Sequence, residues 1–140
     1  MENRLSLVLK NHLSELERMS QAVSGWCRGN AVSTTAEFEV NLALDEIVSN
    51  VIHHGWKDEG EHEVRVRVTR LEDELTVEVE DDAVSFNPLE VPAPDIDQPL
   101  QQRAVGGLGL HLVRQFMDAL EYRQRDGKNL LIMRKKIGGA

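Results

Sequence analysis

The chain has 140 residues, of which 41% are hydrophobic and 29% charged, a balance typical of one globular domain and too short for two ordinary ones. Its formal net charge of −8 argues against direct nucleic-acid binding through an excess of Lys and Arg. The lone Cys27 excludes an internal disulfide, and the sequence has neither a signal peptide nor a run approaching the roughly 18 apolar residues of a membrane helix. We therefore expect a cytoplasmic protein without membrane association.

The chain begins with a predicted strand and a predicted helix. Residues 4–10 partly alternate between apolar and polar side chains, which favours a strand. Residues 13–27 repeat apolar side chains at helical spacing, and Gly29-Asn30 marks the end of that helix.

The strongest helical pattern covers residues 35–56. Thr34 or Thr35 is predicted to cap this helix, because Glu37 lies three residues after Thr34, the spacing of a capping box. Gly55 is a plausible stop signal.

Four more strands are predicted as two hairpins. Residues 63–70 and 74–80 alternate valine and leucine with polar side chains. Residues 119–125 and 129–136 form the second pair, joined by Asp126-Gly127, which favours a tight hairpin turn.

Between the hairpins, residues 81–106 hold all four prolines and show little periodicity, which is typical of a functional loop. A helix over about 108–118 follows. Strands in adjacent pairs, separated by helices, predict an α+β fold: a two-layer α/β sandwich whose mixed, mostly antiparallel sheet carries three helices on one face. We expect residues 1–140 to form this one domain.

The polar side of the long helix is the first candidate site. A polar face is often simply solvated, but Asn is a poor residue for the middle of a helix. Asn50 follows Glu46 by one turn, so that an oxygen from each can reach one point. An amide oxygen suits Mg²⁺, and a carboxylate can activate a hydroxyl or a water.

Two further candidate sites follow the first. Asp81 ends an alternating strand, where a carboxylate can accept from an amino group, although Asp is also common in plain strand-exit turns. Gly106-Gly107-Leu108-Gly109 opens a helix, where glycines and free N–H groups suit a phosphate, although a tight turn with close helix packing has the same composition. The spacing matches neither a P-loop nor a Rossmann motif.

Taken in order, these sites resemble the GHKL ATP-binding superfamily with its Bergerat fold, and within it the RsbW/SpoIIAB-like anti-sigma factor serine/threonine kinases. The resemblance spans nearly the whole chain. Its matching stretches are Leu44-Asp-Glu-Ile-Val-Ser-Asn50 with His54-Gly55, Asp81-Asp-Ala-Val-Ser-Phe-Asn-Pro88, Gly106-Gly-Leu-Gly-Leu-His-Leu-Val113 with Met117-Asp118, and the ending from Tyr122 to Met133.

The resemblance implies a role for each site. Asn50 would hold Mg²⁺ against the ATP phosphates, Glu46 would be the general base, and Asp81 would bind the adenine amino group. Residues 89–105 would form the ATP lid, with the glycines after it shaping the lid hinge and the phosphate loop. The implied nucleotide contacts are Asn50, Asp81, Ala83, Phe86, Gly106, Gly107, Leu108 and Gly109.

The resemblance also implies an activity and partners. The family phosphorylates a serine or threonine of a small anti-anti-sigma (STAS) domain, sequesters an RNA polymerase sigma factor, and often forms homodimers. Ala83 departs from the family pattern, which has glycine there, and its methyl could crowd adenine or forbid a positive φ. A binding module that retains the fold but not phosphoryl transfer is therefore the alternative. A histidine kinase catalytic domain or part of a larger ATPase machine fits less well, because the 140 residues lack an acceptor helix or transducer domains.

Overall fold

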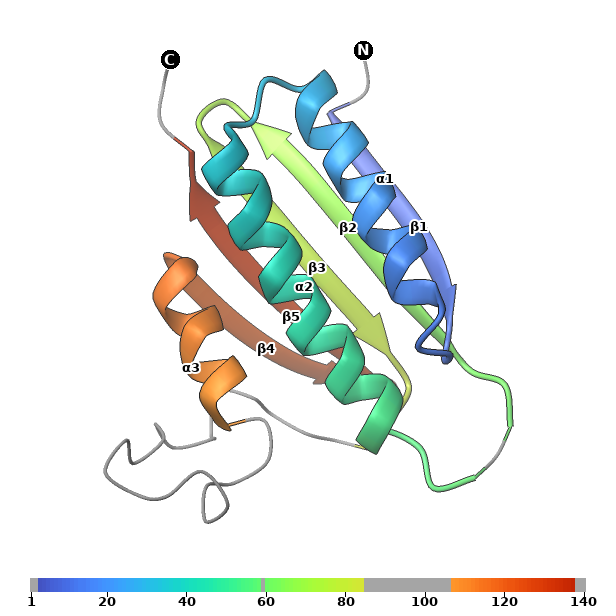
Figure 1. The fold of residues 1–140 in the computed structure, drawn as a ribbon. Coiled ribbons are helices and arrows are strands. Elements are labelled where there is room, and N and C mark those ends of the chain that lie inside the picture. The colour runs from blue at the N-terminus through green and yellow to red at the C-terminus, as the bar shows by residue number, and fades with distance from the viewer. Residues whose placement is uncertain (1–2, 59, 85–106, 138–140) are drawn as a thin grey trace.

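The computed structural model describes residues 3–58, 60–84 and 107–137, and these form three helices and five strands in the predicted order (Figure 1). No helix within these residues is both long and apolar enough to span a bilayer. The elements are β1 (Arg4–Lys10), α1 (Glu15–Gly29), α2 (Thr34–His54), β2 (Glu63–Leu71), β3 (Glu74–Asp81), α3 (Gly107–Phe116), β4 (Ala119–Arg125) and β5 (Lys128–Lys136).

The strands form one sheet in the order β1-β2-β3-β5-β4. Every pairing among the described strands is antiparallel, so the prediction of a mixed sheet is wrong in that detail. The reason is topological. Two helices in succession connect β1 to β2, so that β2 runs opposite to β1. Strands β3 and β4 run in the same direction, but β5 lies between them and pairs antiparallel with both.

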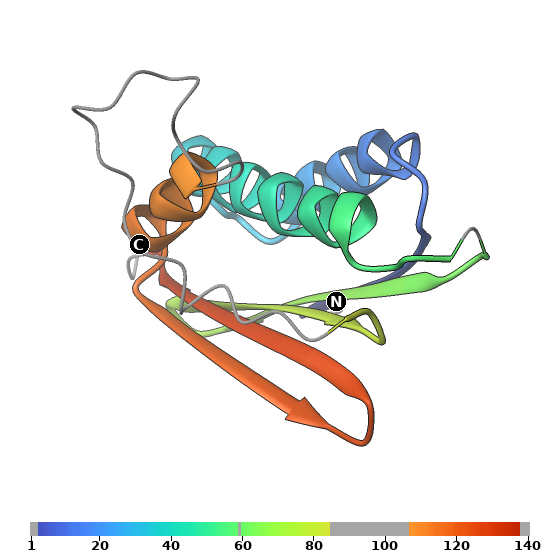
Figure 2. The same ribbon diagram turned by 90° about the horizontal axis from the view of Figure 1, so that it is seen from below.

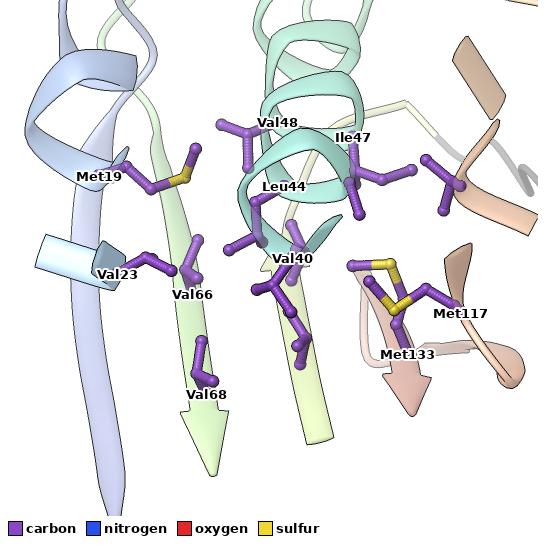
Figure 3. Close-up of a cluster of buried hydrophobic side chains, with 14 of the residues drawn as sticks. Met19, Val23, Val40, Leu44, Ile47, Val48, Val66, Val68, Met117 and Met133 are labelled. Atoms are coloured by element: carbon purple, nitrogen blue, oxygen red, sulfur yellow. The ribbon is translucent and has the colours of Figure 1, made fainter. Parts of the chain in front are cut away.

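The three helices cover one face of the sheet, as predicted (Figure 2). Alternation in β2 turns Val64, Val66 and Val68 toward the helices, where all three are fully buried. In Figure 3, Val40 and Leu44 of α2 lie at the centre of this cluster, with Met19 and Val23 of α1 to one side, and Met117, just after α3, and Met133 of β5 to the other. Burial of each such side chain contributes about 1.5–3 kcal/mol to folding. Because its side chains lie at the centre of this cluster, α2 is the central element of the core.

Helix α2 begins one residue earlier than predicted. Ser33 has an extended backbone, with φ −62° and ψ 156°, and its hydroxyl accepts a hydrogen bond from the Ala36 amide at 3.1 Å. Thr34 and Thr35 already belong to the helix, so the prediction that either is the cap is wrong, and Glu37 is not at capping-box distance from Ser33. The Glu37 carboxylate instead lies 3.5 Å from the Arg28 guanidinium.

Helix α3 is fastened at its C-terminal end by a buried lysine. The Lys135 ammonium donates to the Phe116 carbonyl at 2.8 Å and pairs with the Glu39 carboxylate at 2.9 Å. These contacts join β5, α3 and α2. The neighbouring β4–β5 turn has positive φ at Asp126 (55°) and Gly127 (76°), which confirms the predicted tight hairpin and fixes the β5 register.

The Ser33 cap is testable with two neighbouring hydroxyl residues. Replacing Ser33 by Ala removes the acceptor for the Ala36 amide and should lower the free energy of unfolding by about 1 kcal/mol. Thr34→Ala, which removes a hydroxyl inside the first turn, should change it by only a few tenths of a kcal/mol. Urea denaturation followed by circular dichroism measures both, and equal losses in the two variants would contradict the assignment.

Candidate functional site

Glu46 and Asn50 interact directly on the polar side of α2. The Asn50 amide nitrogen donates to Glu46 Oε1 at 3.0 Å, and both side chains are half-buried. This bond fixes the amide plane, so that Asn50 Oδ1 points away from the carboxylate. The one-turn spacing thus brings the two side chains into contact as predicted, but through the amide nitrogen of Asn50 and not with an oxygen of each residue at one point.

The first turn of α3 packs against this pair. A Cβ atom placed on Gly109 would lie 2.1 Å from the Glu46 carboxyl carbon, so any larger residue here would have to displace the Glu46 carboxylate. Helix α3 begins at Gly107, and the amide groups of its first turn have no acceptor within the helix. The structure thus places the first turn of α3 against Glu46, which is bonded to Asn50, and the amides of a helix N-terminus are donors that suit an anion.

Asp81 lies at the end of β3 and is buried, with 8% of its surface exposed. Its Oδ1 accepts two hydrogen bonds of 2.9 Å, one from the Ala83 amide and one from the Asn129 side chain. Neither bond occupies Oδ2. Burial, the largest influence, raises the pKa of the Asp81 carboxyl, and the two hydrogen bonds oppose that rise.

Asn129 and Tyr122 complete the surroundings of Asp81. Asn129 is directly opposite Asp81 in the β3–β5 register, and its amide also donates to the Ala83 carbonyl at 3.0 Å. The Tyr122 hydroxyl donates to Asn129 Oδ1 at 2.6 Å. Sequence reasoning noted this stretch only as part of a family resemblance. The sequence signal for Asn129 was a polar amide at a position of β5 that faces the core, where the neighbouring inward residues, Leu131 and Met133, are apolar and buried.

Ala83 adopts a backbone that any L-residue accepts. The described non-glycine residues with positive φ are Ala31, Glu72 and Asp126, and Ala83 is not one of them. Its methyl group lies against Gly55, on which a Cβ atom would come within 2.6 Å. The expected conflict with a positive φ is therefore absent at Ala83.

The predicted site residues form two groups along the C-terminal half of α2. One group is Glu46, Asn50 and Gly109. The other is Asp81 and Ala83, which α2 reaches through Gly55, whose carbonyl accepts from the Val84 amide at 2.7 Å. Nine residues of helix separate Glu46 from Gly55, about 13 Å along the axis.

The cavity expected between these groups remains a prediction. Phe86, Gly106 and the proposed lid at 89–105 lie outside the described residues, and the side chain of Leu108 is not described. Asp81 does border a groove with His62 and Asp82 at the end of the sheet, but neither Glu46 nor Asn50 lines it.

The close approach at Gly55 gives a stability test. A methyl group on Gly55 would meet the Val51 carbonyl at 2.4 Å as well as Ala83, and neither neighbour is a flexible side-chain end. Gly55→Ala should therefore lower the free energy of unfolding by about 1–3 kcal/mol.

Gly25 of α1 is the matched control, because nothing lies within 4 Å of its added Cβ. Gly25→Ala should raise the free energy of unfolding by about 0.5–1 kcal/mol. Urea denaturation of both variants checks the pair. A Gly55→Ala protein as stable as Gly25→Ala would show that α2 and the strand exit are not in contact.

Comparison with known proteins places the chain in a family. Residues 9–135 match the histidine kinase-like ATPase domain. The serine-protein kinase RsbW of Listeria monocytogenes is 28% identical over 132 residues, which cover 91% of this chain and 83% of that protein. The serine/threonine-protein kinase BtrW of Bordetella bronchiseptica is 28% identical, over 72% of this chain and 71% of its own length. An anti-sigma F factor of Clostridium perfringens is 29% identical, with 71% of each chain covered.

Two solved structures share the fold. One holds the RsbU and RsbW domains of a Mycobacterium tuberculosis protein, with a TM-score of 0.69 and 12% identity over 96% of this chain, which spans 32% of that one. The other is the histidine kinase domain of a blue-light activated kinase from Erythrobacter litoralis, with a TM-score of 0.56 and 16% identity, over 89% of this chain and 60% of that one. The chain therefore belongs to the histidine kinase-like ATPase domain family and is similar within it to RsbW serine-protein kinases and anti-sigma F factors.

Proposed function

We propose that this protein binds ATP with Mg²⁺ and phosphorylates a serine or threonine of an anti-anti-sigma (STAS) partner, and that it sequesters a sigma factor when that partner is phosphorylated. The observation that carries the proposal is the pairing of Glu46 with Asn50 against Gly109 of α3. A carboxylate, an amide oxygen and a helix N-terminus are the groups that phosphoryl transfer to a hydroxyl requires.

The three groups would divide the chemistry between them. Asn50 Oδ1, turned away from Glu46 by the bond through its own amide nitrogen, is the candidate Mg²⁺ ligand. Bound Mg²⁺ would neutralise charge on the phosphate oxygens. Glu46 would accept the proton of the partner's hydroxyl as that oxygen attacks the terminal phosphate. The first-turn amides of α3 would donate to the phosphates.

Asp81 would recognise the base. Its Oδ1 already accepts from Ala83 and Asn129, so Oδ2 is the oxygen left to accept from the adenine amino group. Asn129, which accepts a hydrogen bond from Tyr122, would hold the carboxylate through Oδ1 and so keep Oδ2 in place. Phe86 and the segment at 89–105 belong to the proposal as further nucleotide contacts and as a lid.

The relatives supply the rest of the proposal. Their names describe serine-protein kinases and an anti-sigma factor, and we extend both activities to this chain together with a cytoplasmic location and a homodimer. The alternative, a module that binds partners without phosphoryl transfer, rested on Ala83. Since Ala83 has no positive φ and packs against Gly55, the argument for this alternative is weaker.

Asp81→Asn tests the recognition of adenine. Ala83 and Asn129 both donate to the Oδ1 position. The asparagine must therefore place its amide oxygen at that position and turn its NH₂ group toward the adenine amino group. Two donors would then face each other, and the affinity for Mg-ATP should fall at least tenfold. Calorimetry measures the affinity, and Asp73→Asn, in the turn at the opposite end of β3, is the control.

The pH dependence provides a second readout for Asp81. Oδ2 is sure to be free of a proton, and so able to accept from adenine, only when the Asp81 carboxyl is ionised. Burial raises the pKa of Asp81. The affinity of the unmodified protein should therefore fall as the pH is lowered toward that raised pKa, and the difference from Asp81→Asn should shrink. A constant ratio of the two affinities across the acidic range would contradict the assignment.

Glu46→Gln tests the general base. The glutamine keeps an oxygen for the Asn50 amide but cannot take up a proton, so Mg-ATP should still bind while phosphate transfer to a cognate STAS protein falls about 100-fold or more. Gly109→Ala should also slow transfer, because its methyl would displace the Glu46 carboxylate. Radiolabelled transfer assays measure both, with Gly25→Ala as the control. Normal transfer by Glu46→Gln would remove Glu46 from the mechanism.

A further inference from the structure

The connection between α2 and β2 touches the strand exit that follows Asp81. The Trp56 indole nitrogen donates to Asp82 Oδ1 at 3.1 Å. The same indole stacks on the His62 ring, with centroids 4.6 Å apart and planes 5° from parallel. We call these three residues, Trp56, His62 and Asp82, the tryptophan clamp.

The clamp has a rigid base on β1. Asn11, just after β1, exchanges hydrogen bonds of 3.0 Å with the His62 backbone, one from each direction, and its side chain donates to the Gly60 carbonyl at 3.1 Å. Asp58 lies 2.7 Å from His62 Nε2. The imidazole is therefore fixed at both its backbone and its ring, and it offers Trp56 an immobile surface on which to stack.

The tryptophan clamp includes the residue that directly follows Asp81. Helix α2, β1 and β3 all end at the same end of the molecule, where the connection to β2 begins (Figure 1). Asp82 follows Asp81 directly, and its side chain is 57% exposed, with Oδ1 bonded to the Trp56 indole and 3.9 Å from His62 Nδ1. Two residues further on, Val84 donates to the Gly55 carbonyl, immediately before Trp56. Gly55 and Trp56, at the end of α2, thus both bond to the chain that follows β3.

We propose that Trp56 is a positioning residue for the nucleotide site: by holding Asp82 through its indole N–H, it sets the direction in which Asp81 Oδ2 faces the adenine. This inference rests on the proposed function. Asn129 restrains Asp81 from β5, and the clamp restrains the following residue from α2. With both restraints, the carboxylate is oriented before any ligand arrives, which lowers the ordering cost of binding.

A double-mutant cycle tests the contact. Trp56→Phe keeps a ring to stack on His62 but has no N–H, and Asp82→Ala removes the acceptor. Each should weaken Mg-ATP binding by about three- to tenfold, and the double variant should be no more than about twofold weaker than either. Asp82→Asn keeps an acceptor oxygen and should bind within about twofold of the unmodified protein. The turnover number for phosphate transfer at saturating ATP should be unchanged throughout.

Trp26→Phe is the matched control, because the buried Trp26 indole nitrogen has no acceptor among the described residues. It should leave the affinity unchanged. Additive losses in the cycle, or full affinity in Trp56→Phe, would overturn the proposal.

Amide NMR spectra without nucleotide separate this proposal from the proposed function. Trp56→Phe should shift the amide signals of Asp82, Ala83 and Val84, and unshifted signals would show that the clamp does not hold the strand exit. If the unmodified protein binds no Mg-ATP while those signals do shift, the proposed function fails, and the nucleotide-positioning role fails with it, but the clamp stands.

Discussion

A carboxylate kept in a buried position at the end of β3 is the constraint around which the rest of this molecule is arranged. Burial disfavours the charged form of Asp81 and raises its pKa, so the side chain needs compensating donors. Ala83 supplies one from the next turn of chain, and Asn129 supplies the other from β5. The second donor is available only because β5 pairs with β3 in a register that sets Asn129 opposite Asp81. The sheet order and the chemistry of the site are therefore linked.

Glycines impose the second constraint, since they set how closely α2 is approached from two directions. Gly109 brings α3 against Glu46, and Gly55 lets the strand exit reach the end of α2. At both places a single methyl group would force the backbones or a functional carboxylate apart. Helix α2 thus sets the spacing between two groups, with the Glu46–Asn50 pair at one point and Gly55, which meets Ala83 and Val84 at the strand exit, about two and a half turns from Glu46.

The sequence was informative wherever a pattern is local. Alternating valines predicted β2, apolar spacing predicted α2, and Asp126-Gly127 predicted the final hairpin, because each depends on neighbours a few residues apart. The one-turn spacing of Glu46 and Asn50 likewise predicted their contact. The cap was misplaced by one residue because three successive hydroxyl side chains, Ser33 to Thr35, satisfy the same local rule.

The partnership of Asp81 with Asn129 spans 48 residues, and no local rule predicts it. It depends on β5 lying between β3 and β4, the same insertion that makes the β3–β5 and β4–β5 pairings antiparallel. The contact of Trp56 with Asp82 also crosses the chain, over 26 residues. Side chains brought together by strand order and by connections were thus beyond what periodicity alone reveals.

The place of β5 has a consequence for biosynthesis. Strand β5, which follows the other four strands along the described chain, occupies an interior position in the sheet, and it carries Leu131 and Met133 of the core as well as the amide opposite Asp81. Until it emerges, the nascent polypeptide exposes the edge of β3, including Val77 and Val79, and the Asp81 carboxylate has no partner from across the sheet. Exposed edges of this kind are prone to aggregation. A nascent chain that has reached only residue 127 would therefore expose this edge of β3 and lack the amide that bonds to Asp81, and the partner for the edge and the amide are supplied together when β5 pairs.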